Sequence, residues 1–578
     1  MMWFLILLLV LVCIGLICFI AWFIHYRKSG RCPLCALDKA GLPTKLTIDT
    51  QDVPDYDNGA ALTPPMGWSS WNTFKQNISE ELILSTAAAM RLSGLVDAGY
   101  QYINIDDCWH SSFRDKNGRL QGDLGKFPSG MPDVIEKINH MGMKVGLYSS
   151  NGTLTCEDLP ASLGNEAVDA KTIAEWGCEF FKYDFCHNKR INGDAPVIEA
   201  IELNRLGKEV EYTLKPEDAE FTGRARIVNI KRLPSGKAVG LLNHNAGTAT
   251  FRTTIDISGE YVLTLLIYKS LNLRHEQYLQ VIVNGEIHEV FAQKTKGFNA
   301  TGRLQLMVNL KAGENEIVLK NPIRSFADSS YTQYSRMARE LKKASKEIAE
   351  KTGNPEKPII FSICEWGTSI PYKWAAKAGN MWRTTHDIMP FWKSVYLIYL
   401  HNVKLYKYAK PGSWNDPDML EVGNGKLTED ENRAHFSLWC MMAAPLVLGN
   451  DIRNFVNEDG TPIENHPVLK IVTNKELIAI DQDPLGKQAK RIKKVSGIDI
   501  LARPLANGDT ALCFFNTSSS TKGLSFDLNE LAEDEYLGFG VPHSSYNVHE
   551  LWSDERFSAT ILSASMPKHG VKVYRISK

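Results

Sequence analysis

The chain has 578 residues, of which 65 are basic and 66 acidic, so its formal net charge is -1. One hydrophobic core does not grow to this size, so the length predicts several domains. The balanced charge excludes a protein that binds nucleic acid through a strongly basic surface, because phosphate binding needs clustered positive charge. The 13 Trp and 20 Tyr side chains are compatible with stacking on sugar rings and equally with an ordinary core.

Residues 3–24 form an almost unbroken apolar segment without a charged side chain. A helix of about 20 such residues spans the hydrocarbon layer of a membrane. The segment is longer than the apolar part of a signal peptide, and no basic residue precedes it. We therefore predict a transmembrane anchor within residues 1–29 and a polar linker over residues 30–60. Arg27, Lys28 and Arg31 would place the body of the protein in the cytoplasm by the positive-inside rule.

Eight short apolar runs follow between residues 61 and 488, and each ends in polar or aromatic residues. Amphipathic helical stretches separate them. Strands that alternate with helices predict a parallel sheet, and eight such units predict a closed (β/α)8 TIM barrel, an α/β fold. The active site of such a barrel lies at the carboxyl ends of its strands. The runs begin at Met66, Tyr102, Lys144, Phe180, Ile359, Met381, Ser413 and Pro445.

Two further regions show strand patterns without intervening helices. Between residues 190 and 329, apolar and polar residues alternate between turn signals, which predicts an antiparallel β-sandwich inserted after the fourth barrel strand. Residues 489–578 are again rich in strand patterns, and Asn507-Gly508 between two of them indicates a hairpin. We therefore predict a C-terminal antiparallel β-sandwich domain.

The predicted barrel strand ends carry an unusual number of carboxylates. Any one of them could cap a loop or form a surface salt bridge, but the set suits glycoside hydrolysis, which needs one ionised and one protonated carboxyl group. Lys182 lies two residues before Asp184, so both side chains should face the same side of the strand. The ammonium should then lower the pKa of the Asp184 carboxyl. The carboxylates are Asp106, Asp107, Asp184, Glu365, Asp387, Asp416 and Asp418.

Several other site types lack their signatures. No Gly-rich phosphate loop follows a predicted strand, and the chain contains neither the H-E-x-x-H zinc motif nor the G-x-S-x-G nucleophile motif. Cys32 and Cys35 form a lone C-x-x-C without a second pair or a histidine at zinc-site spacing. We therefore predict no redox or nucleotide cofactor and no metal site.

Six motifs give the chain a specific resemblance. Over residues 61–189 and 330–578 it resembles glycoside hydrolase family 27, the α-galactosidases or melibiases, a family that also contains α-N-acetylgalactosaminidases. The resemblance implies a retaining mechanism through a covalent glycosyl-enzyme. The motifs are PMGWSSWN (65–72), IDDCW (105–109), KYDFC (182–186), CEWG (364–367), WRTTHDI (382–388) and WNDPDML (414–420).

The resemblance also implies roles for individual residues. Asp184 would be the nucleophile and Asp387 the general acid/base, whereas Asp416 is not expected to be the acid. Asp106 and Asp107 would bind the 4- and 6-hydroxyls of galactose. The other implied pocket residues are Trp68, Tyr148, Lys182 at the 3- and 4-hydroxyls, Arg383 near the 2-hydroxyl, Asp418 and Met419.

Glu365 in the CEWG motif favours galactose as the substrate sugar. Family members that act on N-acetylgalactosamine carry small residues here, and a Glu would fill the space of the acetamido group. The expected activity is an exo-acting α-galactosidase on oligosaccharides or glycoconjugates. An α-N-acetylgalactosaminidase or a β-L-arabinopyranosidase remains an alternative of the same chemistry. A membrane-tethered sugar-binding protein is an alternative of another class, against which the intact Asp184 and Asp387 argue.

Some features depart from the common family plan. The resemblance implies a disulfide between Cys156 and Cys186, but the usual partner of Cys108 is absent, so Cys108 should be a buried thiol. The insertion resembles carbohydrate-binding modules of the calcium-binding β-sandwich kind around residues 216–221, yet it contains no Trp. A sugar-binding role and a structural or homo-oligomer-forming role therefore both stay open. Family habit favours an extracytoplasmic catalytic domain, against the positive-inside rule.

Overall fold

The computed structural model describes residues 13–21, 53–269, 276–293 and 300–578. They contain two compact units, one over residues 190–330 and the other over residues 53–189 and 331–578. Residues 13–21 are helical. Within the described part of the chain, no helix is long and apolar enough to cross a membrane. Most of the predicted anchor over residues 3–24, and Cys32 and Cys35, lie outside the described residues.

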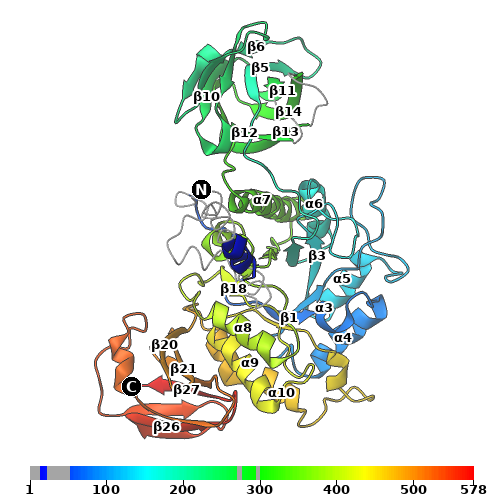
Figure 1. Ribbon diagram of the computed structural model, residues 1–578. Helices are drawn as coiled ribbons and strands as arrows, with labels where there is room; N and C mark the ends of the chain where they lie inside the picture. Colours follow the sequence, from blue (N-terminus) through cyan, green and yellow to red (C-terminus); the bar gives the residue numbers. More distant parts are fainter. Residues whose placement is uncertain (1–12, 22–52, 270–275, 294–299) are drawn as a thin grey trace. The chain divides into compact units, whose positions relative to one another are not determined.

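Eight parallel strands form one sheet in the order β18-β17-β16-β4-β3-β2-β1-β19, which confirms the predicted TIM-like barrel (Figure 1). All residues of β1 and β19 are buried, and burial on both faces explains why these strands read as continuous apolar runs. The strands are β1 (Met66–Ser69), β2 (Tyr102–Ile105), β3 (Lys144–Ser150), β4 (Phe180–Asp184), β16 (Ile360–Ile363), β17 (Met381–Arg383), β18 (Trp414–Asp416) and β19 (Leu446–Leu448).

The barrel closes between its last two strands through a residue that lies beyond β18. Leu420 forms a parallel bridge with Leu448. The N–H of Leu420 donates to the carbonyl of Val447 at 2.7 Å, and the N–H of Gly449 donates to the carbonyl of Leu420 at 3.2 Å. Pro417, which has no N–H to donate, follows β18 directly. The closing contact is therefore displaced into the loop after the strand.

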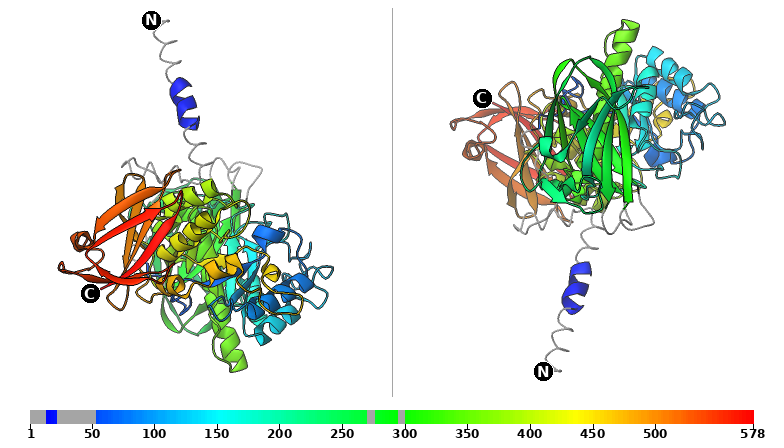
Figure 2. Two further views of the ribbon diagram at one scale, coloured as in Figure 1. Left: turned by 90° about the horizontal axis from the view of Figure 1, so that it is seen from below. Right: turned by 90° about the horizontal axis from the view of Figure 1, so that it is seen from above.

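Helices lie around the barrel strands (Figures 1 and 2). Ser79 caps one of them by accepting the N–H of Leu82, and Thr428 and Glu431 form a capping box at the start of another. The helices are α3 (Trp71–Phe74), α4 (Glu80–Leu92), α5 (Met131–His140), α6 (Glu166–Glu175), α7 (Phe326–Thr352), α8 (Trp392–Asn402), α9 (Glu429–Met441), α10 (Pro467–Val472) and α11 (Lys475–Asp481).

The unit over residues 190–330 consists of two mainly antiparallel sheets around its own apolar core. One sheet contains β7 (Ala219–Phe221), β10 (Ala249–Ile255), β12 (Gln277–Val283), β13 (Glu286–Ala292) and β15 (Gly313–Lys320). The other contains β5 (Val197–Arg205), β6 (Tyr212–Leu214), β8 (Arg226–Asn229), β9 (Lys237–Gly240), β11 (Gly259–Lys269) and β14 (Ala300–Leu310).

The acidic side chains of the segment 216–221 have partners within this unit. Glu217 pairs with Lys237 at 2.6 Å, and Glu220 pairs with Arg252 at 2.6 Å. Asp218 caps a short 3-10 turn, Pro216–Asp218. Among the described residues, the carboxylates of this segment do not gather into a group that could hold a metal ion.

The C-terminal region is an antiparallel β-sandwich, as predicted. The loop 505–509, which contains Asn507-Gly508, joins two of its strands into a hairpin. The sandwich packs on α8, where Trp392 and Tyr399 contact Phe515 and the Tyr399 hydroxyl donates to Asp499 at 2.8 Å (Figure 2). Its strands are β20 (Lys490–Val495), β21 (Ile498–Pro504), β22 (Thr510–Asn516), β23 (Lys522–Asp527), β24 (Tyr546–Glu550), β25 (Arg556–Ala559), β26 (Ile561–Met566) and β27 (Val571–Ser577).

Candidate active site

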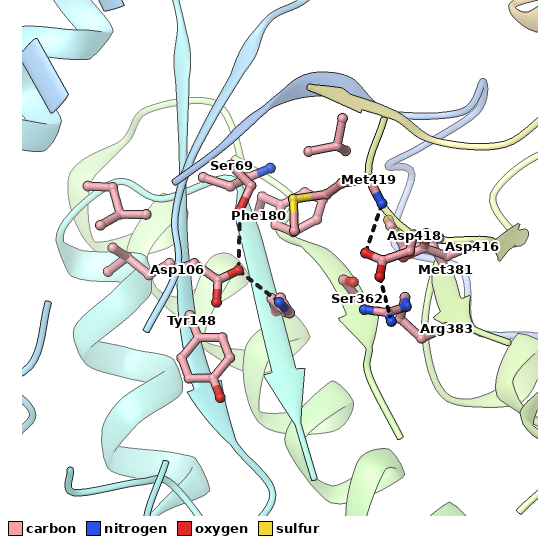
Figure 3. A pocket seen from close by; sticks show the side chains of 15 residues that line it. Ser69, Asp106, Tyr148, Phe180, Ser362, Met381, Arg383, Asp416, Asp418 and Met419 are labelled. Carbon is pink, nitrogen blue, oxygen red and sulfur yellow. Dashed lines mark hydrogen bonds and ion pairs between the residues drawn. The ribbon is translucent and has the colours of Figure 1, made fainter. Parts of the chain in front are cut away.

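A cavity lies among the carboxyl ends of the barrel strands (Figure 3). Six of the predicted site residues contribute to its wall: Asp106, Tyr148, Lys182, Arg383, Asp418 and Met419. The other lining side chains were not singled out as pocket residues in the sequence: Ser69, Asn104, Ile105, Leu147, Phe180, Ser362, Met381, Asp416 and Val447.

One side of the cavity carries an ion pair between neighbouring strands. The ammonium of Lys182 in β4 lies 2.8 Å from the carboxylate of Asp106, which directly follows β2. The hydroxyl of Ser69 donates to the same carboxylate at 3.2 Å. Burial disfavours the ammonium, but the negative charges of Asp106, Cys364 and Asp184 together outweigh burial and raise the pKa of Lys182. This side therefore holds one fixed positive and one fixed negative charge.

The opposite side carries one guanidinium between two carboxylates. Arg383, the last residue of β17, lies 2.7 Å from Asp418 and 3.0 Å from Asp387. The Asp418 side chain is 4% exposed, whereas that of Asp387 is 68% exposed. Asp418 also accepts the N–H of Ile388 at 2.7 Å, so it contacts the backbone next to Asp387. Figure 3 shows Arg383 and Asp418 facing Asp106 across the cavity.

Asp184 ends β4 and is 6% exposed. One of its oxygens accepts the N–H of Phe185 at 2.8 Å. Burial raises the pKa of Asp184, Lys182 lowers it and Asp387 raises it again, and the net direction is upward. The expectation of a lowered pKa was therefore wrong for the ligand-free protein. Lys182 acts in the expected direction, but it is paired with Asp106, and the loss of water around Asp184 outweighs its effect.

Asp387 shows the opposite shift. Burial of the carboxyl raises its pKa, but the charge and hydrogen bond of Arg383, together with the charges of Lys182 and His386, outweigh this and hold the pKa of Asp387 below its usual value. These shifts favour an ionised Asp387 and a more easily protonated Asp184.

Glu365 is fully buried just after β16 and does not belong to the wall of the described cavity. One carboxyl oxygen accepts the N–H of Ser369 at 2.8 Å, and the other finds no hydrogen-bond partner among the described residues. Burial raises the pKa of Glu365 to about 8, so the carboxyl is largely protonated at neutral pH. The Glu365 carboxyl group is therefore buried and held to its own loop, and its role in filling the space of an acetamido group stays a prediction.

Trp68 and Asp107 are also buried outside the cavity wall. The indole N–H of Trp68 donates to the carbonyl of Asn450 at 2.7 Å. The Asp107 carboxylate accepts the N–H groups of Cys108 at 2.7 Å and Glu157 at 3.1 Å. Burial raises the pKa of Asp107 to about 6. In the ligand-free protein, both side chains hold neighbouring loops.

The structure contains the disulfide between Cys156 and Cys186 that the resemblance implies, and Cys108 is a buried free thiol. The hydroxyl of Tyr148 contacts Cys156 at 3.2 Å. Among the described residues, Cys156, Cys186 and Asp184 form the only group with the spacing of metal ligands. Because both sulfur atoms are oxidised, this group offers no thiolate to an ion.

Several lining residues escaped the sequence interpretation for a physical reason. Ser69 and Asn104 are short polar side chains at strand ends, which look like ordinary loop residues until their neighbours are known. Ser69 lies inside the PMGWSSWN motif, and Asn104 directly precedes the IDDCW motif. These positions are the sequence signal that could have identified the two residues. Asp416 was noted in the sequence without a pocket role, yet it lies in the cavity wall.

Comparison with known proteins agrees with this architecture. Residues 63–233 and 326–483 match the family described as α-galactosidase A, and residues 495–576 match the α-galactosidase C-terminal β-sandwich domain. The chain is 31% identical to α-galactosidase A of Cellvibrio japonicus over 552 residues, which cover 93% of this chain and 97% of that one. It is also 31% identical to α-galactosidase 2 of Arabidopsis thaliana, covering 92% and 96%.

Solved structures give the same picture. α-Galactosidase I from Mortierella vinacea superposes with a TM-score of 0.59 at 26% identity, covering 90% of this chain and 98% of that one. The α-galactosidase from Saccharomyces cerevisiae with raffinose has a TM-score of 0.58 at 24% identity, covering 91% and 99%, and so supports the fold alone. The chain belongs to the α-galactosidase A family of glycoside hydrolases.

Proposed function

We propose that the chain is a retaining, exo-acting α-galactosidase that hydrolyses terminal non-reducing α-D-galactosyl residues. The observation that carries the proposal is the pair Asp184 and Asp387 beside a cavity whose two sides each hold a cation paired with carboxylates. The chain's relatives over nine-tenths of its length are α-galactosidases, which supports the same substrate class.

The Asp106–Lys182 side is suited to hold a sugar. An ammonium donates and a carboxylate accepts, so adjacent hydroxyl groups can bind both partners with charge-assisted hydrogen bonds. Tyr148 and Met419 offer apolar surface to the sugar ring. Because the two charges neutralise each other, the ligand-free cavity avoids the cost of an isolated buried charge.

In the first step, the Asp184 carboxylate attacks the anomeric carbon while Asp387 gives its proton to the glycosidic oxygen. A carbon–oxygen bond to the enzyme forms as the bond to the leaving group breaks. In the second step, Asp387 takes a proton from water, and the resulting hydroxide displaces Asp184 and releases galactose. Each residue returns to its initial protonation state.

These roles need an ionised Asp184 and a protonated Asp387, the reverse of the pKa directions in the ligand-free site. Asp387 is 68% exposed, so a bound substrate would remove much of the water that stabilises its anion. Desolvation raises the pKa of a carboxyl group. We infer that substrate binding raises the pKa of Asp387 and so favours the protonated form that a general acid requires.

The choice of galactose over N-acetylgalactosamine rests on the relatives, and Glu365 remains the proposed residue for excluding the acetamido group. The full-length protein can be assayed with 4-nitrophenyl α-galactoside, its N-acetylgalactosamine counterpart and the β-L-arabinopyranoside. We expect the first to be turned over fastest. Fast turnover of another substrate with little of the first would reject the assignment. Loss of turnover in Asp184→Ala would separate it from a contaminating enzyme.

We also propose that the apolar segment 3–24 holds the protein to a membrane. Alkaline carbonate extraction of membranes from expressing cells should leave the full-length chain in the pellet. Release into the supernatant would reject the anchor. Protease treatment of whole cells would then tell on which side the catalytic domain lies.

A further inference from the structure

Asp416 ends β18 and lies in the cavity wall, but the proposed mechanism gives it no role. Its carboxylate accepts the N–H of Asp418 at 2.8 Å. Its backbone carbonyl accepts the N–H of Thr384 at 3.0 Å and the Thr384 hydroxyl at 3.1 Å. Asp416 therefore connects the end of β17 with the loop that follows β18.

The loop that Asp416 holds has an unusual backbone. Asp418 has φ of 84°, in the left-handed region that residues other than glycine rarely adopt. Such a conformation persists only where the surrounding contacts impose it. Pro417 cannot donate a hydrogen bond, so the N–H of Asp418 is the next one that can restrain this turn, and it donates to the Asp416 carboxylate. The indole N–H of Trp439 holds the same turn from the other side by donating to the backbone carbonyl of Asp418 at 2.9 Å.

Asp418 passes this restraint on to the neighbourhood of Asp387. One oxygen of Asp418 accepts the N–H of Met419 at 2.8 Å, and the other meets the N–H of Ile388 and the guanidinium of Arg383, each at 2.7 Å. Arg383 in turn holds Asp387 at 3.0 Å. The exposed Asp387 is thus flanked by a backbone and a side chain that both depend on one buried carboxylate.

We propose that Asp416 is a positioning residue: it fixes the Asp418 turn, and through Arg383 and Ile388 it aims the Asp387 carboxyl at the glycosidic oxygen. The inference rests on the proposed function, in which Asp387 is the general acid/base. It differs from a sugar-binding role, because the contact that matters is made to the backbone of Asp418.

A displaced acid has a recognisable effect on kinetics. It slows substrates whose leaving group must be protonated and spares those whose leaving group departs as a stable anion. Raffinose belongs to the first kind and 2,4-dinitrophenyl α-galactoside to the second. The ratio of kcat/KM for the dinitrophenyl substrate to kcat/KM for raffinose therefore reports the position of Asp387. A general loss of folded protein lowers both values equally and leaves this ratio unchanged.

The test compares Asp416→Ala and Asp416→Asn in the full-length chain. We expect Asp416→Ala to lower kcat/KM for raffinose about 100-fold and kcat/KM for the dinitrophenyl substrate less than about tenfold. The comparison uses kcat/KM because it reports the first step alone, whereas kcat also contains the second step, in which Asp387 acts as the base. The Asp416→Asn amide oxygen can still accept the N–H of Asp418, so this variant should recover most of the loss. Asp387→Ala should show the same leaving-group dependence, at least as strongly.

Asp527→Ala is the matched control. Asp527 accepts the N–H of Asn529 at 2.9 Å with the same two-residue spacing, but it lies in the C-terminal sandwich. Loss of the Asp527 carboxylate should lower the thermal midpoint of unfolding without changing the ratio of the two kcat/KM values.

The pH profile gives a second readout. Weaker contact between Arg383 and Asp387 should raise the pKa of Asp387, so the basic limb of kcat/KM should move to higher pH in Asp416→Ala. The groups that act electrostatically with Asp387 are Lys182, Arg383, His386, Asp184, Asp418 and Cys364.

The outcomes separate the alternatives. An unchanged ratio in a folded Asp416→Ala overturns the positioning role, as does an equal loss in both variants on both substrates, which would indicate a direct sugar contact. If Asp416→Ala does not fold, Asp418→Asn must show the leaving-group dependence, and a normal ratio there also overturns the proposal. A wild-type protein inactive on both substrates would instead reject the proposed function.

Discussion

The two sides of the cavity contain the same kinds of side chain, carboxylates and a cation, in different arrangements. The Asp106–Lys182 side is a one-to-one pair between the residue that follows β2 and the middle residue of β4, two strands that are joined through the regular register of β3. The other side places one guanidinium, Arg383, between a buried and an exposed carboxylate on loops after strands of only three residues. The Asp106–Lys182 pair has one stable charge state. On the other side, Arg383 can pair with either Asp387 or Asp418.

This difference corresponds to the difference between binding and proton transfer. A fixed pair at regular strand ends costs little to reorganise and gives defined hydrogen-bond directions to a sugar. A proton donor must change its charge during the reaction, so its surroundings must tolerate both states. The exposed Asp387 can be tolerated in both charge states, because Arg383 keeps a second partner in Asp418. A second fully buried ion pair would not tolerate the loss of one charge.

The largest expected effect comes from Asp184, which stands between the two sides. Asp184→Ala removes the nucleophile and should lower kcat on the order of 10,000-fold or more. Added azide can attack the vacated face of the anomeric carbon and displace an aryl leaving group, giving β-galactosyl azide. Mass spectrometry and NMR of the products would detect it. Azide rescue that yields the α-anomer would instead assign the nucleophile elsewhere.

A second prediction separates the two sides directly. Lys182→Met leaves the buried Asp106 carboxylate without its cation, and kcat/KM should fall on the order of 100-fold for every leaving group. Arg383→Met should lower kcat/KM for raffinose more than kcat/KM for 2,4-dinitrophenyl α-galactoside, because it disturbs the position of Asp387. Steady-state kinetics on both substrates checks this. Equal profiles for the two variants would remove the distinction between the sides.

The sequence predicted the first side better than the second. Asp106 follows one predicted barrel strand and Lys182 lies within another, two residues before its end, and parallel strand ends meet at one edge, so their proximity followed from the fold class. The partners of Arg383 depend on the left-handed turn at Asp418 and on the N–H of Ile388, which donates to Asp418. No local sequence pattern predicts either feature. The seam of the barrel at Leu420 escaped prediction for the same reason.

Electrostatic directions were harder to predict than positions. The spacing of Lys182 and Asp184 correctly indicated an ammonium close to the carboxyl group, but the pKa depends on the balance between that charge and burial. Burial is a property of the whole packed barrel. Likewise, the chemistry of Glu365 could be read from its motif, whereas its enclosed position and its contact with Ser369 could not.

Glu365 lies on neither side of the cavity, and its charge state can be tested through stability. Its pKa of about 8 in the folded protein lies above the usual value of about 4.3 in an unfolded chain. The folded state therefore binds the proton more tightly, and the stability this gives is lost as the pH rises from about 4.5 to about 8. Glu365→Gln cannot titrate, so its thermal midpoint should fall less over that window.

Thermal unfolding of both proteins across this pH range checks the Glu365→Gln prediction, with a difference of up to a few kcal/mol expected near the upper end. A constant difference between variant and wild type at all pH values would mean that Glu365 is ionised in the folded protein.

The smallest expected effect concerns the choice of sugar. Glu365→Ser shortens a side chain that is held to its own loop by Ser369, so only part of the freed space would reach a bound sugar. The ratio of kcat/KM for α-N-acetylgalactosaminide over α-galactoside should rise about tenfold, near the lower limit of what one lost group contributes to discrimination. Ser369→Ala, which keeps the backbone N–H that Glu365 accepts, serves as the matched control and should leave the ratio unchanged. A Glu365→Ser ratio equal to that of the wild type would place sugar discrimination on the Asp106–Lys182 side alone.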